Sequence, residues 1–151
     1  MRKMRIALIL VVVFAASLTA VSRAEEKPAP NDLDRQKAAM AALRDVATAV
    51  ENYAVANKVY PGPTEGYVDV ETLRPKLQPS YTKDLTAKDP WSHPLRYWSD
   101  GKHYAIASNG RDGNADQPYE KVTAQTKISR FDGDIIYRDG MFVQWPEGPQ
   151  H

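Results

Sequence analysis

The stretch from Leu33 to Asn57 contains neither proline nor glycine, and its periodicity constrains the fold more than any other feature of the chain. Apolar side chains recur in steps of three and four, the spacing of one helix face, at Met40, Leu43, Val46, Ala47, Val50, Tyr53 and Ala54. Asn31 or Asp32 is suited to cap the start, and Pro61 follows the end. The pattern predicts one amphipathic helix of about six turns.

The C-terminal half changes to the short aromatic and aliphatic runs of β-strands. Residues 95–99 and 102–109 flank Asp100-Gly101, and residues 134–138 and 141–145 flank Asp139-Gly140. Asp-Gly is a strong signal for a two-residue hairpin, because such turns need positive φ. We therefore expect an α+β fold in which the long helix covers a small antiparallel sheet of two hairpins. Packing of the alanine-rich helix on another subunit is the alternative, but a sheet this small needs its own cover.

The remaining segments are expected to be mostly loop. A short helix is expected from Asp69 to Leu73, ending near Pro75, with loop up to Pro90. Between the hairpins, Gly110 to Gly133 is long, rich in Asp, Asn and Gly, and without a regular pattern. Loops of this length are usually functional or disordered.

The first 24 residues have the order of a secretory signal peptide. A basic start, Met1 to Arg5, precedes an apolar run over residues 6–21 and small residues before Glu25. An uncleaved membrane anchor is the alternative, and a lipoprotein is excluded because no cysteine follows the run. We expect residues 1–24 to be the signal, 25–31 a flexible tether with two prolines, and 32–151 one domain. The protein is then periplasmic or extracellular, or anchored in the inner membrane if the segment is retained.

Composition removes several classes of protein. The chain has 151 residues, no cysteine, and 20 Lys or Arg against 19 Asp or Glu. Near-neutral charge argues against a dedicated nucleic-acid-binding protein. Absence of cysteine excludes disulfides, thiol nucleophiles and cysteine-ligated metals. An exported domain of this kind must be stabilised by packing or by a metal ion.

No motif of a common enzyme class is present. The sequence lacks a phosphate loop, Gly-x-Ser-x-Gly, His-Glu-x-x-His and the dinucleotide fingerprint. His93, His103 and His151 do not have zinc-ligand spacing and are expected in loops or at the surface. We expect no enzymatic activity.

The aromatic residues of the C-terminal half allow two interpretations. They are Trp91, Tyr97, Trp98, Tyr104 and Trp145. Such side chains form either a carbohydrate- or partner-binding platform or the packing of a small core. Strand alternation places Tyr97 and Trp98 on opposite faces of the sheet.

The long loop carries the best candidate for a site. Its oxygen donors are Asn109, Asp112, Asn114, Asp116, Asp132 and Asp134. Calcium takes about six to eight oxygen ligands, and the nearby glycines allow the chain to wrap an ion. An EF-hand is excluded, because Asp112-Gly-Asn114-Ala-Asp116 lacks the later Gly and Glu. A loop that serves only as turns is the alternative.

Four motifs occur in a fixed order between residues 36 and 136. They are Asn57-Lys-Val-Tyr60-Pro61, Tyr81-Thr-Lys-Asp-Leu85 with Lys88-Asp-Pro-Trp91 and Pro94-Leu-Arg-Tyr97, Ser108-Asn-Gly110-Arg-Asp112-Gly113, and Asp134-Ile135. Together they resemble the C-terminal globular domain of the type II secretion major pseudopilin, protein G. Ser92 and His93 stand where that family usually has Gly and Asn. Residues 1–24 lack the prepilin-peptidase site, and Pro28 and Pro30 interrupt the family's continuous helix.

The resemblance implies a calcium site in the long loop. It assigns carboxylates to Asp112 and Asp134 and backbone carbonyls near Asn109 and Asn114, while Asp116 and Asp132 are additions from the local sequence. The function expected is an exported, non-catalytic, calcium-binding structural or interaction module, with protein partners that include type II secretion components. A membrane-anchored pilus-like subunit and a periplasmic glycan-binding protein or enzyme on the same fold are the alternatives.

Overall fold

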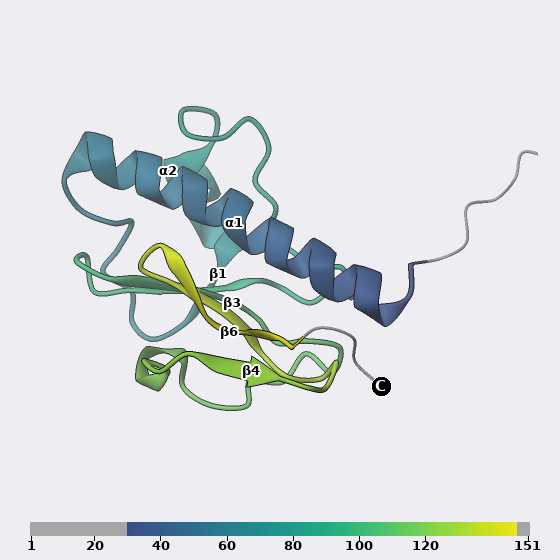
Figure 1. Cartoon of the computed structure of the whole chain (residues 1–151). Coiled ribbons are helices and arrows are strands. Elements are labelled where there is room, and N and C mark those ends of the chain that lie inside the picture. Colours follow the sequence, from purple (N-terminus) through teal and green to yellow (C-terminus); the bar gives the residue numbers. More distant parts are fainter. Residues whose placement is uncertain (1–29, 148–151) are drawn as a thin grey trace, which may run out of the picture.

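The computed structural model describes residues 30–147 and shows one long helix lying along one face of a twisted sheet (Figure 1). The α+β class and the helix-on-sheet arrangement predicted from the sequence are confirmed. Within residues 30–147, no helix is long and apolar enough to cross a membrane. The predicted signal peptide or anchor over residues 1–24 and residues 25–29 of the tether lie outside the described residues.

The long helix, α1, spans Asp32–Asn57. The Asn31 side chain caps its start by accepting a hydrogen bond of 2.9 Å from the Asp34 amide. Lys58, with a φ of 62°, ends it in the left-handed region. The buried face consists of Gln36, Ala39, Ala42, Leu43, Val46, Ala47, Ala49 and Val50. The three-and-four spacing seen in the sequence therefore faces the sheet.

The sheet has six strands in the order β1-β2-β3-β5-β6-β4. Their bounds are Val68–Asp69, Arg96–Ser99, Tyr104–Ser108, Ile135–Arg138, Met141–Pro146 and Thr126–Ile128 in that order. Neighbouring strands are antiparallel except β4 and β6, which are parallel. The expectation of a small, purely antiparallel sheet is therefore wrong. It missed β1, which is two residues long, and β4, which is short and mostly exposed and so carries no alternating pattern.

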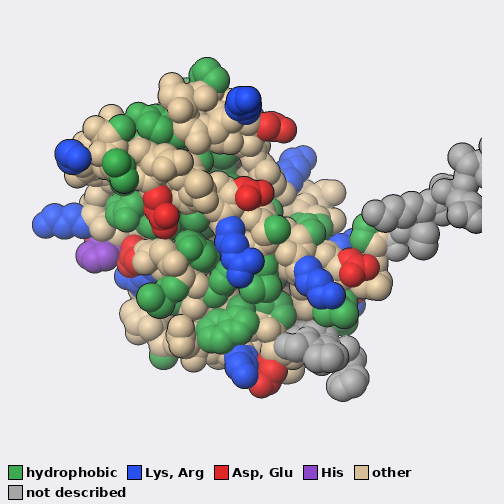
Figure 2. Space-filling model, turned by 45° about the horizontal axis from the view of Figure 1, so that its top comes forward, with side chains coloured by type: hydrophobic (Ala, Val, Ile, Leu, Met, Phe, Trp, Pro, Cys, Tyr) green, Lys and Arg blue, Asp and Glu red, His purple; other side chains and the backbone are tan. Residues whose placement is uncertain are grey.

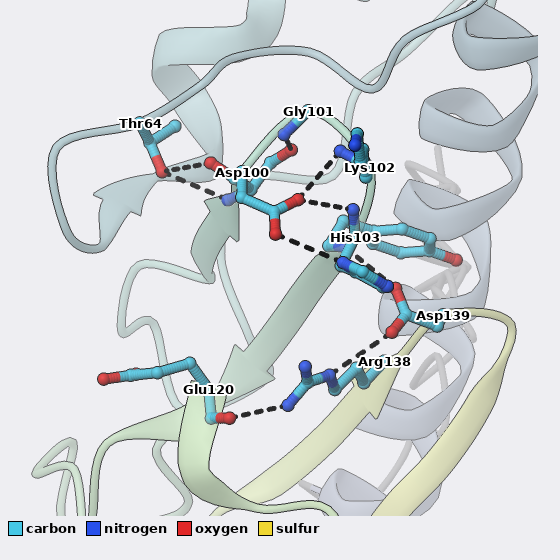
Figure 3. A network of polar contacts seen from close by, with 10 residues as sticks. Thr64, Asp100, Gly101, Lys102, His103, Glu120, Arg138 and Asp139 are labelled. Carbon is cyan, nitrogen blue, oxygen red and sulfur yellow. Dashed lines mark hydrogen bonds and ion pairs between the residues drawn. The ribbon is translucent and has the colours of Figure 1, made fainter.

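The two Asp-Gly turns differ from each other (Figure 3). Between β5 and β6, Arg138 pairs with Met141, so Asp139-Gly140 is a two-residue turn with φ values of 46° and 92°. Between β2 and β3, Ser99 pairs with Tyr104, which leaves a four-residue connection. The Asp100 carboxylate stabilises this longer turn by accepting hydrogen bonds from the amides of Lys102 (2.8 Å) and His103 (2.6 Å). The two-residue prediction is wrong for this first turn.

The connection from α1 to β2 contains more helix than expected. A 3₁₀ turn, η1, covers Val70–Leu73, and a short helix, α2, follows at Arg74–Leu77. Pro75 does not end the helix, because it lies in the first turn of α2, where its missing amide hydrogen is not needed.

The sheet is covered on both faces. One face packs against α1, with Tyr97, Tyr104 and Ile106 fully buried there. The other face carries Ala105, Ala107, Ile136 and Val143, and the 110–133 segment covers it with Tyr119 and Val122. This segment includes a 3₁₀ turn, η2, at Tyr119–Lys121, and β4. In Figure 1 it lies on the side of the sheet away from α1. The part of the segment before β4, which the sequence suggested was loop, therefore forms a third layer, whereas β4 itself joins the edge of the sheet.

Of the five aromatic residues singled out in the sequence, Trp91, Tyr97, Trp98 and Tyr104 pack in or against the two apolar clusters. Tyr97 is fully buried on the helix side, and Trp98 is half-buried on the other side, which confirms the predicted alternation. Trp91 and Trp145 are also only half-buried. On the face seen in Figure 2, acidic and basic side chains are interspersed instead of being separated by sign.

Candidate functional site

The candidate site centres on Asp134, which immediately precedes β5. Its side chain is 0% exposed. Oδ2 accepts a hydrogen bond of 2.8 Å from the Asp116 amide, whereas Oδ1 has no hydrogen-bond partner in residues 30–147. Burial, the largest cause, and the negative charges of Asp116 and Asp112 together raise the Asp134 pKa to about 7. A buried carboxylate with one free oxygen is either protonated or neutralised by a cation.

Asp116 and Asp134 are joined by two hydrogen bonds, each from the backbone amide of one residue to the carboxylate of the other. Besides the bond from its amide, its own carboxylate accepts a hydrogen bond of 3.3 Å from the Asp134 amide. Its other oxygen forms an ion pair of 2.6 Å with Arg130. The structure therefore brings together two of the six predicted site residues, one within the 110–133 segment and one directly after it.

Three further predicted residues lie in residues 109–116, which we call the first limb of the region. Residues 130–134 form its second limb. Asn109 is 9% exposed, and its Oδ1 accepts a hydrogen bond from the Tyr119 hydroxyl while its Nδ2 donates to the Gly113 carbonyl at 3.2 Å. Asp112 is exposed and accepts from the Asn114 amide at 3.0 Å, the geometry of an Asx turn. Asn114 is also exposed. The side-chain oxygen of Asn109 is thus already used, which leaves the backbone carbonyls of this limb as donors.

Asp132, the sixth predicted residue, forms a salt bridge. Its two oxygens lie 2.8 and 3.2 Å from Nε and a terminal nitrogen of Arg111. Across residues 30–147, no three His, Asp or Glu side chains gather closely enough to hold one metal ion. A cation near Asp134 would therefore need backbone carbonyls and water in addition to carboxylates.

Gly110 allows the backbones of the two limbs to pass in direct contact. Its φ is +66°, and a Cβ there would lie 2.8 Å from the carbonyl oxygens of Asp132 and Gly133. Only glycine meets both requirements, the left-handed backbone and the close approach. This crossing brings the start of the segment beside Asp134.

A cavity of about 590 Å³ opens beside Asp116. It is lined by residues of β2, the 110–133 segment and the loops beside them, among them Tyr67, Arg96, Asn109, Asp116 and Tyr119. The cavity gives solvent a route to the first limb of the segment.

Sequence reasoning missed Asp89, which is 5% exposed. Its carboxylate accepts hydrogen bonds from the amides of Trp91 (3.0 Å) and His93 (2.9 Å) and from the Ser108 hydroxyl (2.8 Å). The Asp-Pro-Trp motif is therefore a braced turn fastened to the end of β3. An Asp before a Pro is a turn signal that pointed to this role.

The three histidines form no site in the described part of the chain. His103 is exposed and lies 3.1 Å from the Asp100 carboxylate. The Nε2 atom of His93 lies 3.1 Å from the Arg111 carbonyl oxygen. His151 is outside the described residues.

Comparison with known proteins identifies the family to which this chain belongs. The family model described as type II secretion system (T2SS), protein G, matches residues 29–127. A search of curated proteins finds no significant match. The family match covers more than half of the chain and includes α1, the braced Asp89 turn and the first limb of the candidate site. The chain therefore belongs to the protein G family of the type II secretion system.

Proposed function

We propose that this protein is a non-catalytic structural component of a type II secretion apparatus, stabilised by a calcium ion in its 109–134 region. The family match supports the link to secretion. The single observation that carries the calcium proposal is the fully buried Asp134 carboxylate with one oxygen free of hydrogen bonds. An anionic group buried in this way calls for a cation or a proton.

The donor set suits a hard cation. Asp134 Oδ1 would be one ligand, Asp112 would supply a second carboxylate, and backbone carbonyls near Asn109 and Asn114 would add neutral oxygens. Asp116 would contribute by holding Asp134 or by turning a carboxylate oxygen toward the ion. Calcium accepts such irregular, all-oxygen sets with water in the remaining positions, whereas zinc prefers four tetrahedral ligands that include nitrogen or sulfur.

The role of the ion would be mechanical. A bound calcium would link the first limb of the 110–133 segment to the start of β5 and so hold the third layer on the sheet. This layer packs through only a few apolar side chains, chiefly Tyr119 and Val122. A fixed layer presents a defined surface to protein partners, for which we propose other components of the secretion apparatus.

We propose that the domain lies on the periplasmic side of the inner membrane. If residues 1–24 are removed as a signal, the protein is periplasmic or secreted, and if they are retained it is an anchored, pilus-like subunit. Sequencing the N-terminus of the mature protein distinguishes the two, because cleavage gives a chain that starts at Glu25.

Isothermal titration with calcium at pH 8 tests the proposal. That pH lies above the Asp134 pKa of about 7, so protons do not compete with the ion. We expect one site in the full chain and its loss in Asp134→Asn. Asp45→Asn is the matched control, because Asp45 is an exposed aspartate on α1, away from the segment. Absence of calcium binding by the unaltered protein, or undiminished binding by Asp134→Asn, would contradict the proposal.

A further inference from the structure

Arg111 joins parts of the molecule that are far apart in sequence. Its guanidinium forms a two-bond ion pair with Asp132 at 2.8 and 3.2 Å, and its remaining terminal nitrogen lies 3.2 Å from the Asp32 carboxylate. Its amide donates to the Phe131 carbonyl at 2.9 Å. Its carbonyl oxygen lies 3.1 Å from His93 Nε2. One residue therefore touches both limbs of the 110–133 segment, the start of α1 and the Asp89 turn.

These contacts lie directly beside the candidate calcium site, where the Arg111–Asp132 ion pair joins the two limbs; we call this ion pair the neck of the site. Arg111 directly precedes Asp112, and its partner Asp132 lies two residues before Asp134. The ion pair therefore clamps the two limbs next to the two carboxylates that the calcium proposal uses. Within the described residues the guanidinium pairs with Asp132 and Asp32 and not with Asp112 or Asp134.

The first turn of α1 is tied to the same neck. Asp32 also accepts a hydrogen bond of 3.0 Å from the Trp91 indole, and this bond and the charge of Arg111 lower the Asp32 pKa. One turn later, the side-chain Nε2 of Gln36 donates to the Arg130 carbonyl at 3.4 Å. The helix start thus contacts both limbs, through Arg111 on one and Arg130 on the other.

We propose that Arg111 is a positioning residue that couples calcium binding in the 109–134 region to the first turn of α1. This inference rests on the proposed calcium site. With the neck closed, Asp112 and Asp134 are held near each other before the ion arrives, so less order must be gained on binding. Because coupling between sites is reciprocal, a bound ion should in turn hold the start of α1 more firmly.

The direct test measures calcium affinity in Arg111→Gln by isothermal titration of the full chain. We expect binding at least about tenfold weaker, the usual effect of removing a group that orients metal ligands, although no ligand is lost. In chelator the melting temperature should change little, because these ion pairs are partly exposed and contribute little to stability. Arg111→Lys, which keeps the charge but not the forked geometry, should show an intermediate affinity and serves if Arg111→Gln folds poorly.

Asp132→Asn distinguishes the clamp from direct ligation. If Asp132 acts by holding Arg111, its substitution should weaken binding to a similar degree, and the double variant with Arg111→Gln should be no weaker than either single one. Asp132 as a ligand of the ion, the role expected from the sequence, would instead give additive losses. Additive losses would overturn the inference.

The link to α1 has its own variant and control. Asp32→Asn keeps an oxygen for the Trp91 indole and removes the charge that faces Arg111, so we expect calcium binding weakened a few-fold. Arg35→Gln is the matched control, since Arg35 also pairs with Asp32, at 3.4 Å, but does not reach the loop. Calcium should slow amide exchange in the first turn of α1 in the unaltered protein and not in Arg111→Gln.

The outcomes separate the two proposals. If the unaltered protein binds no calcium, the proposed function fails and this inference fails with it. If the unaltered protein binds calcium and both Arg111 variants bind it equally well, the calcium site stands and the positioning role of Arg111 is wrong. Calcium-induced protection of α1 that persists in Arg111→Gln would also overturn the coupling.

Discussion

At the scale of single residues, the backbone conformation of Ser92 shows what its departure from the family pattern costs. Ser92 stands where the resembled family usually has glycine, and its φ is 73°, in the left-handed region. It follows the Asp89-Pro90-Trp91 turn, and its amide donates to the Asp89 carbonyl at 2.9 Å. The turn therefore requires a conformation that serine adopts at a cost and glycine adopts freely.

Replacing Ser92 by glycine should stabilise the protein by roughly 0.5–1 kcal/mol, the relief of left-handed strain less the added freedom of the unfolded chain. Chemical denaturation in the presence of chelator measures this change without any contribution from calcium. Ser80→Gly is the control, since Ser80 is exposed with an ordinary φ and should lose stability or show no change. An equal gain at both positions would show that the backbone explanation is wrong.

At the scale of elements, the connection between β2 and β3 depends on one ionised side chain. The Asp100 carboxylate accepts hydrogen bonds from the amides of His103 and Lys102 and lies 3.1 Å from the His103 ring. These contacts, the His103 amide first, lower the Asp100 pKa to about 2. The neighbouring Asp139 accepts from the Tyr104 amide at 2.9 Å, so the aspartate of the second turn links that turn to the start of β3 (Figure 3).

The lowered pKa of Asp100 predicts the direction of a pH effect. An unfolded aspartate has a pKa near 3.9, so the folded state holds the ionised form more strongly. The stabilisation is then complete above about pH 4 and is lost as the pH falls from 4 toward 2. Stability of Asp100→Asn, followed by denaturation across that range, should fall less steeply than that of the unaltered protein. Asp84→Asn, at an exposed aspartate, should leave the slope unchanged, and an unchanged slope in Asp100→Asn would refute this account.

At the scale of the whole molecule, the three layers differ in what holds them. The α1 layer buries a continuous apolar face against the sheet, whereas the opposite layer packs with fewer apolar side chains and many polar contacts. That layer connects to the rest of the protein at Asp134, Arg111 and the Arg138 side chain, which donates to the Glu120 carbonyl at 2.7 Å. An ion bound at Asp134 would therefore act on stability mainly through this layer.

The proposed calcium site predicts how stability depends on calcium concentration. A ligand that binds only the folded state adds about 2.7 kcal/mol at a hundred times its Kd and about 1.4 kcal/mol for each further tenfold. We expect the melting temperature to rise in that logarithmic manner above pH 7. Magnesium should have a smaller effect, because it requires stricter geometry and gives up water reluctantly. A rise that is equal for both ions at matched ionic strength would indicate screening and not a specific site.

The sequence alone predicted those features that depend on neighbours along the chain. The spacing of apolar residues in α1, a cap at Asn31 or Asp32 and the two-residue turn at Asp139-Gly140 are local, and the structure contains all three, with Asn31 as the cap. The family that the motifs indicated, confirmed by the match to protein G over residues 29–127, is also a property of the chain, although Asp134-Ile135 lies beyond that match. Such features are readable because the backbone physics that produces them acts within a few residues.

Only the tertiary structure decided which long-range partners each residue found. In the structure β4 is a parallel neighbour of β6, and part of the expected loop covers the sheet. Asp132 forms an ion pair with Arg111, and Asp134 is buried beside Asp116. Aspartates of one loop look alike in the sequence, yet their roles depend on burial and on the charges packed near them. Those quantities arise when segments distant in sequence come together, so the composition of the loop indicated a possible site, and only the packing distinguished its aspartates from one another.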